Sequence, residues 1–166
     1  MRKPDSLRAA LTAALPDLVR NPDRLAIFID RGSIAARMSA APNHPNPSFE
    51  YRYRLTALLT DLPADRPDIV MVAAVDWLHI HQPDLLQSHA GDPIDFEAEI
   101  LDGETIDLVM RLQLSESVVA RARDGGGFDL TRPADPPAIE EFDGVPRWTP
   151  LERIYVDGTL MLGEDP

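Results

Sequence analysis

The stretch from residue 94 to residue 114 constrains the fold most, because its apolar and polar side chains alternate on both sides of a turn signal. The apolar positions of this stretch are Ile94, Phe96, Ala98, Ile100, Ile106, Leu108, Met110, Leu112 and Leu114. The Asp102-Gly103 dipeptide between the two runs is typical of a tight hairpin turn. We therefore predict an antiparallel hairpin whose apolar side chains face inward and whose acidic side chains face solvent.

Further segments carry the same strand-like alternation. Residues 24–40 and 48–62 both predict strands, and the proline-rich stretch at 42–47 predicts a surface loop that joins them as an antiparallel pair. Gly32 interrupts the first of these strands and predicts a bulge or a tight bend. The glycine run at 125–127 predicts the turn of another hairpin, because a strand-like segment follows it where a phosphate-binding loop would open a helix.

Two segments have helical spacing. Residues 4–18 place leucine and alanine at intervals of three and four, with Asp5 or Ser6 as the expected N-cap and Pro16 as the point where the helix kinks or restarts. Residues 67–82 begin with a proline suited to a first helical turn and end before a second proline. This segment is apolar nearly all round, so we expect the helix to be well buried.

These elements predict an α+β fold, a mainly antiparallel sheet with about two helices packed on it. A short C-terminal β-hairpin is expected to turn at Asp157-Gly158. We predict a single α+β domain over residues 1–132, a proline-rich linker over 133–150, and a C-terminal hairpin and tail over 151–166.

The composition argues against several classes of protein. The formal net charge of −12 disfavours binding to nucleic acid, because no run of basic residues offsets it. The chain has no cysteine, which excludes disulfides, thiol catalysis and thiolate metal ligands. Lys3 is its only lysine, so we expect no lysine in the interior of the fold. The N-terminus lacks the apolar region of a signal peptide and no run is long enough to span a membrane, so we expect a soluble protein made in the cytoplasm, with no membrane partner.

The segment DWLHIHQPDLL, residues 76–86, holds two of the four histidines beside two aspartates. A zinc or iron site needs ligands that converge on one point, and a metal-dependent hydrolase using His79 and His81 is the enzymatic alternative. On a helix, residues at i and i+2 point to nearly opposite sides, so these histidines cannot share a metal ion. We interpret them as helix-end residues, where the carbonyl end of the helix dipole favours an imidazole.

Asp95, Glu97 and Glu99, here called the acidic row, share one face of the predicted strand. Carboxylates in such a row can bind divalent cations, act as acid and base, repel a passing polyanion such as DNA, or simply solvate a sheet face. The row lacks the spacing of a calcium loop, and the chain shows no nucleophile with an obvious base and no cofactor motif. The residues therefore favour a binding or structural protein over an enzyme, with no metal and no cofactor.

Five segments of the sequence show a family resemblance: KPDSLRAAL, NPDRLAIFIDRGSIAA, FEYRYRLTALLTDL, DWL and QPDLL. In these segments, over residues 3–86 and more loosely to Glu116, the sequence resembles the tail completion protein R (GpR) family of contractile-tailed temperate phages. The resemblance implies a fold like that of tail terminators and a structural, non-catalytic part of a virion tail. Such a protein is made in the bacterial host cytoplasm, for a phage or for a headless tail-like particle.

The resemblance also implies where the protein works. It would cap the head-proximal end of the tail tube and sheath and prepare that end for joining to head completion or connector proteins. A homo-oligomeric ring is expected, a hexamer where the ring caps a six-fold tube, and DNA would pass through it without specific binding. A tail assembly chaperone that is not retained in the virion is the alternative.

Two hypotheses assign the charged strands of such a ring. In the first, the exposed strand edge around Ile27 and Ile29 pairs with a neighbouring subunit, and Arg52 and Arg54 meet the acidic row of that neighbour. In the second, the acidic row lines the lumen and keeps DNA from binding there. The sequence leaves both open.

Overall fold

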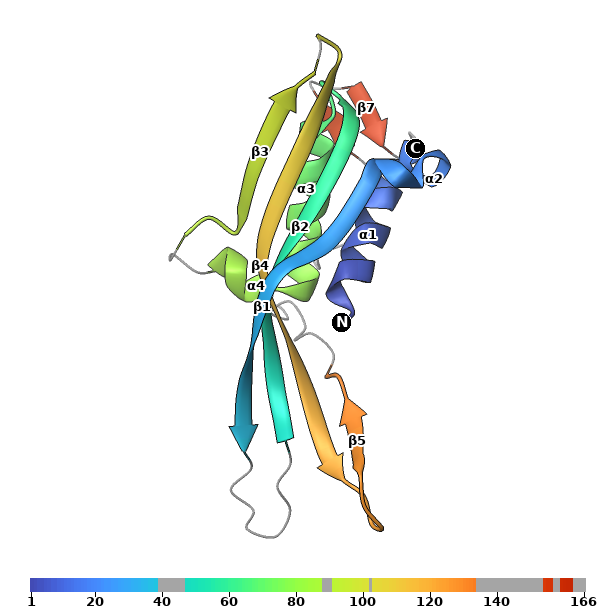
Figure 1. The fold of residues 1–166 in the computed structure, drawn as a ribbon. Helices are drawn as coiled ribbons and strands as arrows, with labels where there is room; N and C mark the ends of the chain where they lie inside the picture. Colours follow the sequence, from blue (N-terminus) through green and yellow to red (C-terminus); the bar gives the residue numbers. More distant parts are fainter. Residues whose placement is uncertain (39–46, 88–90, 102, 134–153, 157–158, 163–166) are drawn as a thin grey trace, which may run out of the picture.

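A long antiparallel sheet forms the body of the protein (Figure 1). The computed structural model describes residues 1–38, 47–87, 91–101, 103–133, 154–156 and 159–162. The strands of the sheet are β1 (Leu25–Met38), β2 (Pro47–Pro63), β3 (Ile94–Ile100), β4 (Thr105–Ala122) and β5 (Phe128–Thr131). They follow the order β1-β2-β4-β3, and β5 pairs with the far end of β4. Each of these pairings is antiparallel.

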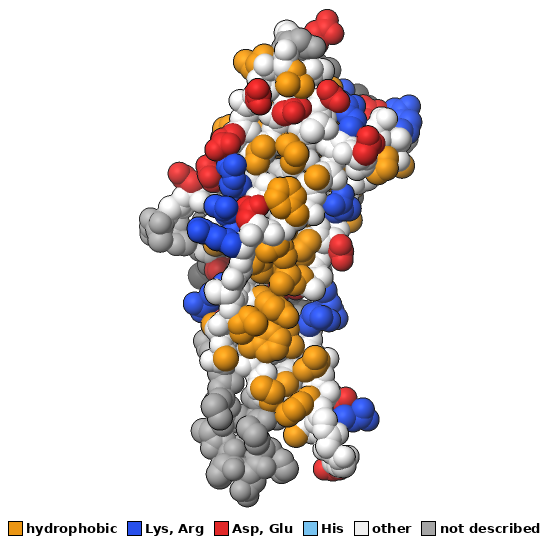
Figure 2. Space-filling view, viewed as in Figure 1, with side chains coloured by type: hydrophobic (Ala, Val, Ile, Leu, Met, Phe, Trp, Pro, Cys, Tyr) orange, Lys and Arg blue, Asp and Glu red, His pale blue; other side chains and the backbone are white. Residues whose placement is uncertain are grey.

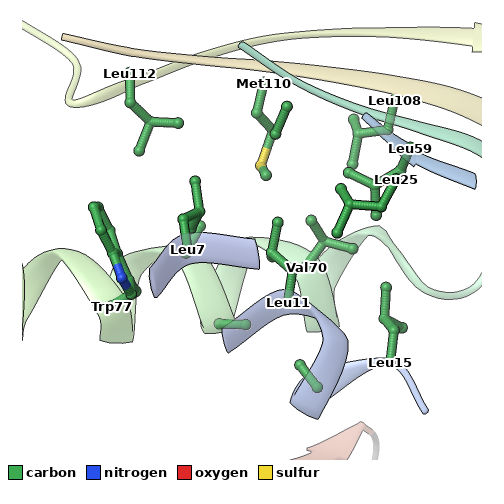
Figure 3. Close-up of a cluster of buried hydrophobic side chains, with 14 of the residues drawn as sticks. Leu7, Leu11, Leu15, Leu25, Leu59, Val70, Trp77, Leu108, Met110 and Leu112 are labelled. Atoms are coloured by element: carbon green, nitrogen blue, oxygen red, sulfur yellow. The ribbon is translucent and has the colours of Figure 1, made fainter. Parts of the chain in front are cut away.

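Two helices, α1 (Lys3–Ala14) and α3 (Pro67–His81), pack against each other on one face of this sheet (Figure 1). Shorter helical segments are α2 (Asp17–Arg20), the 3-10 turn η1 (Pro22–Arg24) and α4 (Pro83–Gln87). Leu7 and Leu11 of α1 and Trp77 of α3 lie across from Met110 and Leu112 of β4, in one hydrophobic core (Figure 3). The predicted α+β fold is confirmed.

The sheet twists strongly along its length. In Figure 1, β1 lies to the right of β2 and β4 in the upper half and to their left in the lower half. The strands β2 and β4 have 17 and 18 residues, and right-handed twist accumulates over strands of that length. The two edges of the sheet therefore exchange sides between its upper and lower halves.

Apolar surface remains exposed along the sheet. Figure 2 shows a band of hydrophobic side chains that runs down the middle of the visible face, with charged side chains beside it. Exposed apolar residues of the strands include Phe28, Ile34 and Leu130, and also Phe96 and Ile100, which lie on the helix-bearing face. Extended apolar surface of this kind is typical of proteins that bind a partner or another copy of themselves.

The predicted hairpin at residues 94–114 is present, but only its second strand is buried. The five inward positions of β4 from Ile106 to Leu114 all lie in the core, as predicted. On β3, Phe96 is 57% exposed and Ile100 is 77% exposed, although the register places both on the helix-bearing face. The predicted burial of these two residues is wrong. Ile94 is the only described residue of β3 that packs against the core.

The helix predicted at residues 67–82 is confirmed as α3, but its burial is one-sided. Its first turn contains the expected proline, and it ends just before Pro83, which begins α4. Val72, Val75 and Ile80 are 42%, 36% and 41% exposed, so the expectation of burial nearly all round is wrong. The helix packs on the sheet and on α1 with one face, and the opposite face keeps its apolar side chains in solvent.

The first helix begins earlier than the capping pattern predicts. Arg2 holds the N-cap position, and neither Asp5 nor Ser6 caps the helix. The Ser6 hydroxyl instead accepts a hydrogen bond from Trp77 Nε1 at 2.9 Å. The break expected at Pro16 is confirmed, because α1 ends at Ala14 and α2 starts at Asp17.

The irregularity of β1 lies two residues before the position expected for it. The register shifts between Ile29 and Arg31, so the bulge is at Asp30, and the prediction of a bulge at Gly32 is wrong. Gly32 serves close strand packing, because an added Cβ would lie 3.1 Å from Tyr53 Cβ and 3.2 Å from the Arg52 carbonyl oxygen. The glycine is required by the neighbouring strand rather than by a bend.

The remaining elements complete the chain. The turn between β4 and β5 is the predicted glycine run, whose residues all have positive φ. At the end of the chain, β6 (Ile154–Val156) and β7 (Thr159–Leu162) pair antiparallel, and Leu162 is half-buried against the core. The expected turn at 157–158 and nearly all of the expected linker at 133–150 lie outside the described residues, so the hairpin and the domain boundaries stay predictions. Within the described part of the chain, no helix is long and apolar enough to cross a membrane.

Candidate functional site

The residues predicted to form a subunit interface lie at two opposite edges of the sheet and between them. Ile27 and Ile29 are on β1, where they stand opposite Ala57 and Leu55 of β2 and face the helices. Ile27 is half-buried against the core, and Ile29 is 36% exposed. The acidic row lies on β3, at the other edge. One copy of the chain therefore does not bring the two groups together.

Arg52 and Arg54 lie on β2 and face the outer side of the sheet, the face away from α1 and α3. Arg54 Nε lies 2.8 Å from Asp30 Oδ2, and Arg52 Nε lies 2.8 Å from Glu50 Oε2. The Arg52 side chain is 61% exposed, so its ion pair contributes little stability. Both arginines thus have a carboxylate partner on the strand pair β1–β2, and a neighbouring subunit would meet them already paired.

The acidic row has a cationic partner in the same chain. Arg111 stands opposite Asp95 in the β3–β4 register, and its Nη1 lies 3.1 Å from Glu97 Oε1 and 3.8 Å from Asp95 Oδ2. Glu99 stands opposite Asp107, and the described residues give it no ion pair. Arg111 therefore partly neutralises Asp95 and Glu97, whereas Glu99 keeps its negative charge without an ion pair among the described residues.

Hydrogen bonds shift the pKa values of three groups on the outer face. The Thr56 hydroxyl donates to Asp30 Oδ2 at 2.7 Å and, together with Arg54, lowers the pKa of Asp30 against an opposing effect of burial. Arg111 donates to Glu97 and lowers the pKa of that carboxyl, and the same contact raises the pKa of Arg111. Asp30, Glu97 and Arg111 are therefore fully charged at neutral pH.

An open cleft of about 570 Å³ lies on the outer face beside the arginines. Arg31, Arg52 and Arg54 line one part of it, and Asp84 lines another. Within the described residues Arg31 has no ion pair, so this cleft offers a free guanidinium to an anionic group of a partner. None of the described residues that line the cleft is a histidine, so among them its serines have no imidazole base.

A buried carboxylate, which the sequence predictions missed, holds the start of α1. Glu116 Oε2 accepts a hydrogen bond from the Arg2 backbone N–H at 2.8 Å, and Oε1 accepts one from the Lys3 N–H at 3.3 Å. The Tyr53 hydroxyl also donates to this carboxylate. Glu116 thus takes the role of a capping residue and places its charge at the positive end of the helix dipole.

Lys3 is buried, with 4% exposure, and the expectation that the interior holds no lysine is wrong. Its Nζ donates to the backbone carbonyl of His81 and, at 2.8 Å, to Gln82 Oε1. Gln82 Oε1 also accepts from the Ser115 backbone N–H at 3.1 Å. The ammonium group is accommodated because it satisfies oxygen atoms at the C-terminal end of α3. Lys3 and Gln82 together join α1, α3 and the middle of β4.

The two histidines lie in the last turn of α3, as predicted. His81 Nε2 lies 3.0 Å from Ser6 Oγ, and its ring centroid is 4.9 Å from that of Trp77. In the part of the chain that the structure describes, no three side chains of the metal-ligating types lie close enough together to hold an ion. His89, the next histidine along the chain, lies outside that part. The geometry gives the alternative of a metal-dependent hydrolase no support.

Comparison with known proteins gives one coherent picture. The profile of a family described as P2 phage tail completion protein R (GpR) matches residues 1–136. The chain is 36% identical over 163 residues to tail completion protein R of Escherichia phage P2, which covers 97% of each of the two chains. No solved structure matches the chain. The chain belongs to the P2 phage tail completion protein R (GpR) family.

Proposed function

We propose that this chain is a structural protein that completes a phage-type tail by capping the head-proximal end of the tube and sheath. The observation that carries the proposal is the similarity to tail completion protein R of Escherichia phage P2 over 97% of both chains. A match of this extent covers the exposed strands and loops as well as the core, so it supports a shared role and not only a shared fold.

The proposed mechanism is stoichiometric. Subunits form a closed ring, a hexamer on a six-fold tube, in which each copy uses two different patches for its two neighbours. One surface of the ring contacts tube and sheath, and another contacts the head completion or connector proteins. The interface residues that we propose are Ile27, Ile29, Arg52, Arg54, Asp95, Glu97 and Glu99. The exposed apolar residues of the strands support the proposal, because an assembly would bury them.

DNA would pass through the ring without specific binding. The formal net charge of −12 supports this, because a negative protein repels the phosphate backbone. The acidic row on the outer face is one candidate for lining the lumen, and the arginines of the same face are candidates for contacts between subunits.

We propose no catalytic step. Among the described residues no histidine lines the cleft beside the arginines, and His81 of α3 contacts Ser6 and Trp77. Stoichiometric zinc, iron or manganese in the purified protein would contradict this part of the proposal and would favour a metal-dependent hydrolase.

The role is tested by removing the gene from a strain that produces the particles. Electron microscopy of the lysate should show tails that are not joined to heads, with an irregular upper end, and a plasmid copy of the wild-type gene should restore joined particles. Joined particles in normal number without the gene would contradict the proposal. If the particle is headless, removal of the gene should leave the tube with an irregular head-proximal end and should abolish the biological activity of the particle.

A further inference from the structure

We infer that β1 of one copy pairs, antiparallel, with β3 of the next copy, so that the sheets of the ring form one continuous surface. This inference rests on the ring of the proposed function and names the strands that build it. The contact joins β1 and β3, which stand at the two ends of the strand order β1-β2-β4-β3, and its partner is a second copy of this chain.

Both strands have an open outer side. β1 and β3 are the two ends of the sheet, and among the described strands nothing pairs with their outer sides. On β1 the Leu25 carbonyl is taken, because Arg8 Nη1 donates to it at 2.8 Å. The rest of β1 up to Ile34 is largely exposed, and β3 is exposed along nearly its whole length. Open strand edges are templates for pairing with another chain.

The strand directions fix the orientation of the pairing. Each neighbour in the order β1-β2-β4-β3 is antiparallel to the next, so β3 runs opposite to β1 within one copy. Rotation about an axis along the strands places the next copy's β3 beside β1 with its direction unchanged. The new pair is therefore antiparallel, and the helix-bearing faces of the two copies stay on the same side.

The rows of the helix-bearing face match at the two edges. One row runs Ile29, Leu55, Leu112, Ile94 and the next runs Ile27, Ala57, Met110, Phe96. With no shift along the strands, Phe96 of the next copy lies beside Ile27, and Ile94 lies beside Ile29. These contacts bury a phenylalanine that one copy leaves 57% exposed, and they continue the hydrophobic core from copy to copy.

The outer face is complementary in charge. Three arginines, Arg31, Arg52 and Arg54, stand on the β1–β2 side, and the acidic row stands on the β3 side. In the unshifted pairing, Asp95 of the next copy lies beside Phe28, within reach of the extended Arg31 side chain. Pairing of β3 with another β3 would instead place like charges opposite each other, which destabilises a strand pair. The charges therefore favour a head-to-tail contact over a two-fold one.

Disulfide trapping tests the contact cleanly, because the chain has no cysteine of its own. Ala26→Cys on β1 is combined in turn with Asp95→Cys, Glu97→Cys or Glu99→Cys on β3, all on the outer face. The control is Ala26→Cys with Phe96→Cys, whose second site faces the other side. Each full-length variant replaces the wild-type gene in the producing strain, and the lysate is oxidised and examined on a non-reducing gel.

At least one same-face pair should give a ladder of covalent multimers beyond the dimer, at least tenfold stronger than that of the control. Single-cysteine variants should give at most dimers. Absence of a ladder from all three pairs, in strains that still make joined particles, would overturn the β1–β3 contact while leaving the proposed function intact. Ladders of equal strength from the control would also overturn it, because they would mean that the faces are not aligned.

Charge exchange keeps the inference testable if a cysteine variant fails to support particle formation. Arg31→Asp and Asp95→Arg should each lower the yield of joined particles at least tenfold, and the double variant should recover most of that loss. Asp124→Arg, an exposed charge change in the turn between β4 and β5 and on neither edge strand, serves as the control and should leave the yield unchanged. A double variant no better than the worse single variant would contradict the contact.

Discussion

Glu116 shows how one side chain joins distant parts of this sequence. It stands at an inward position of β4, in the alternating series that otherwise holds Leu112, Leu114, Val118 and Ala120, and it is 9% exposed. An acidic residue at a core position is a signal that the sequence contains. Its partners could not be predicted, because they lie 63 to 114 positions away and capping patterns operate within one turn.

Glu116→Gln should destabilise the protein by about 1–3 kcal/mol. The amide group can still accept one hydrogen bond, but it turns a donor toward the backbone N–H groups of α1 and removes the charge at the helix N-terminus. Urea unfolding measures the loss. Glu99→Gln, at an exposed carboxylate on β3, is the control and should change the free energy of unfolding by less than about 0.5 kcal/mol. Equal effects of the two substitutions would contradict the capping role.

Periodicity predicted which segments form helices and strands, but it did not predict which of their apolar side chains are buried. The alternation of residues 94–114 gave the hairpin, yet Phe96 and Ile100 are exposed, because alternation reports which face a residue is on and not whether another element covers it. The exposed face of α3 has the same cause. The bulge was placed at Gly32 because glycine is the local signal for one, whereas Asp30 holds the bulge through contacts to another strand.

The bulge of β1 is held to β2 by Asp30, which accepts hydrogen bonds from Thr56 and Arg54. Because these contacts lower the pKa of Asp30 below the ordinary value of 3.8, its stabilising contribution is complete above that pH and is lost as the pH falls through the lower, folded-state pKa. Thr56→Val removes the largest cause and should raise the pKa of Asp30, as measured by NMR titration of its carboxyl carbon. Thr60→Val on the same strand should leave that pKa unchanged. An Asp30 pKa that is the same in Thr56→Val and in the wild type would contradict the assignment.

Across the whole chain, the sequence segments that resemble the family include residues that hold the helices and the sheet together, as well as residues on the surface. Gln82, in the segment QPDLL, accepts hydrogen bonds from Lys3 and from the backbone of β4. Trp77, in the segment DWL, lies in the core. The candidate interface was predicted from charge and strand edges. Its distribution over two opposite edges could not be predicted, because the order of the strands across the sheet is not contained in local periodicity.

Quantitative mass spectrometry of purified particles can count the copies of this chain and so decide whether it is a permanent cap of the tail, as we propose. We expect a small, constant number per particle, that of a single ring of about six subunits, many times below the number of tube or sheath subunits. Absence of the protein from finished particles would contradict the claim and identify an assembly chaperone. A copy number that rises in proportion to the tube protein would contradict it as well, because a cap is added once.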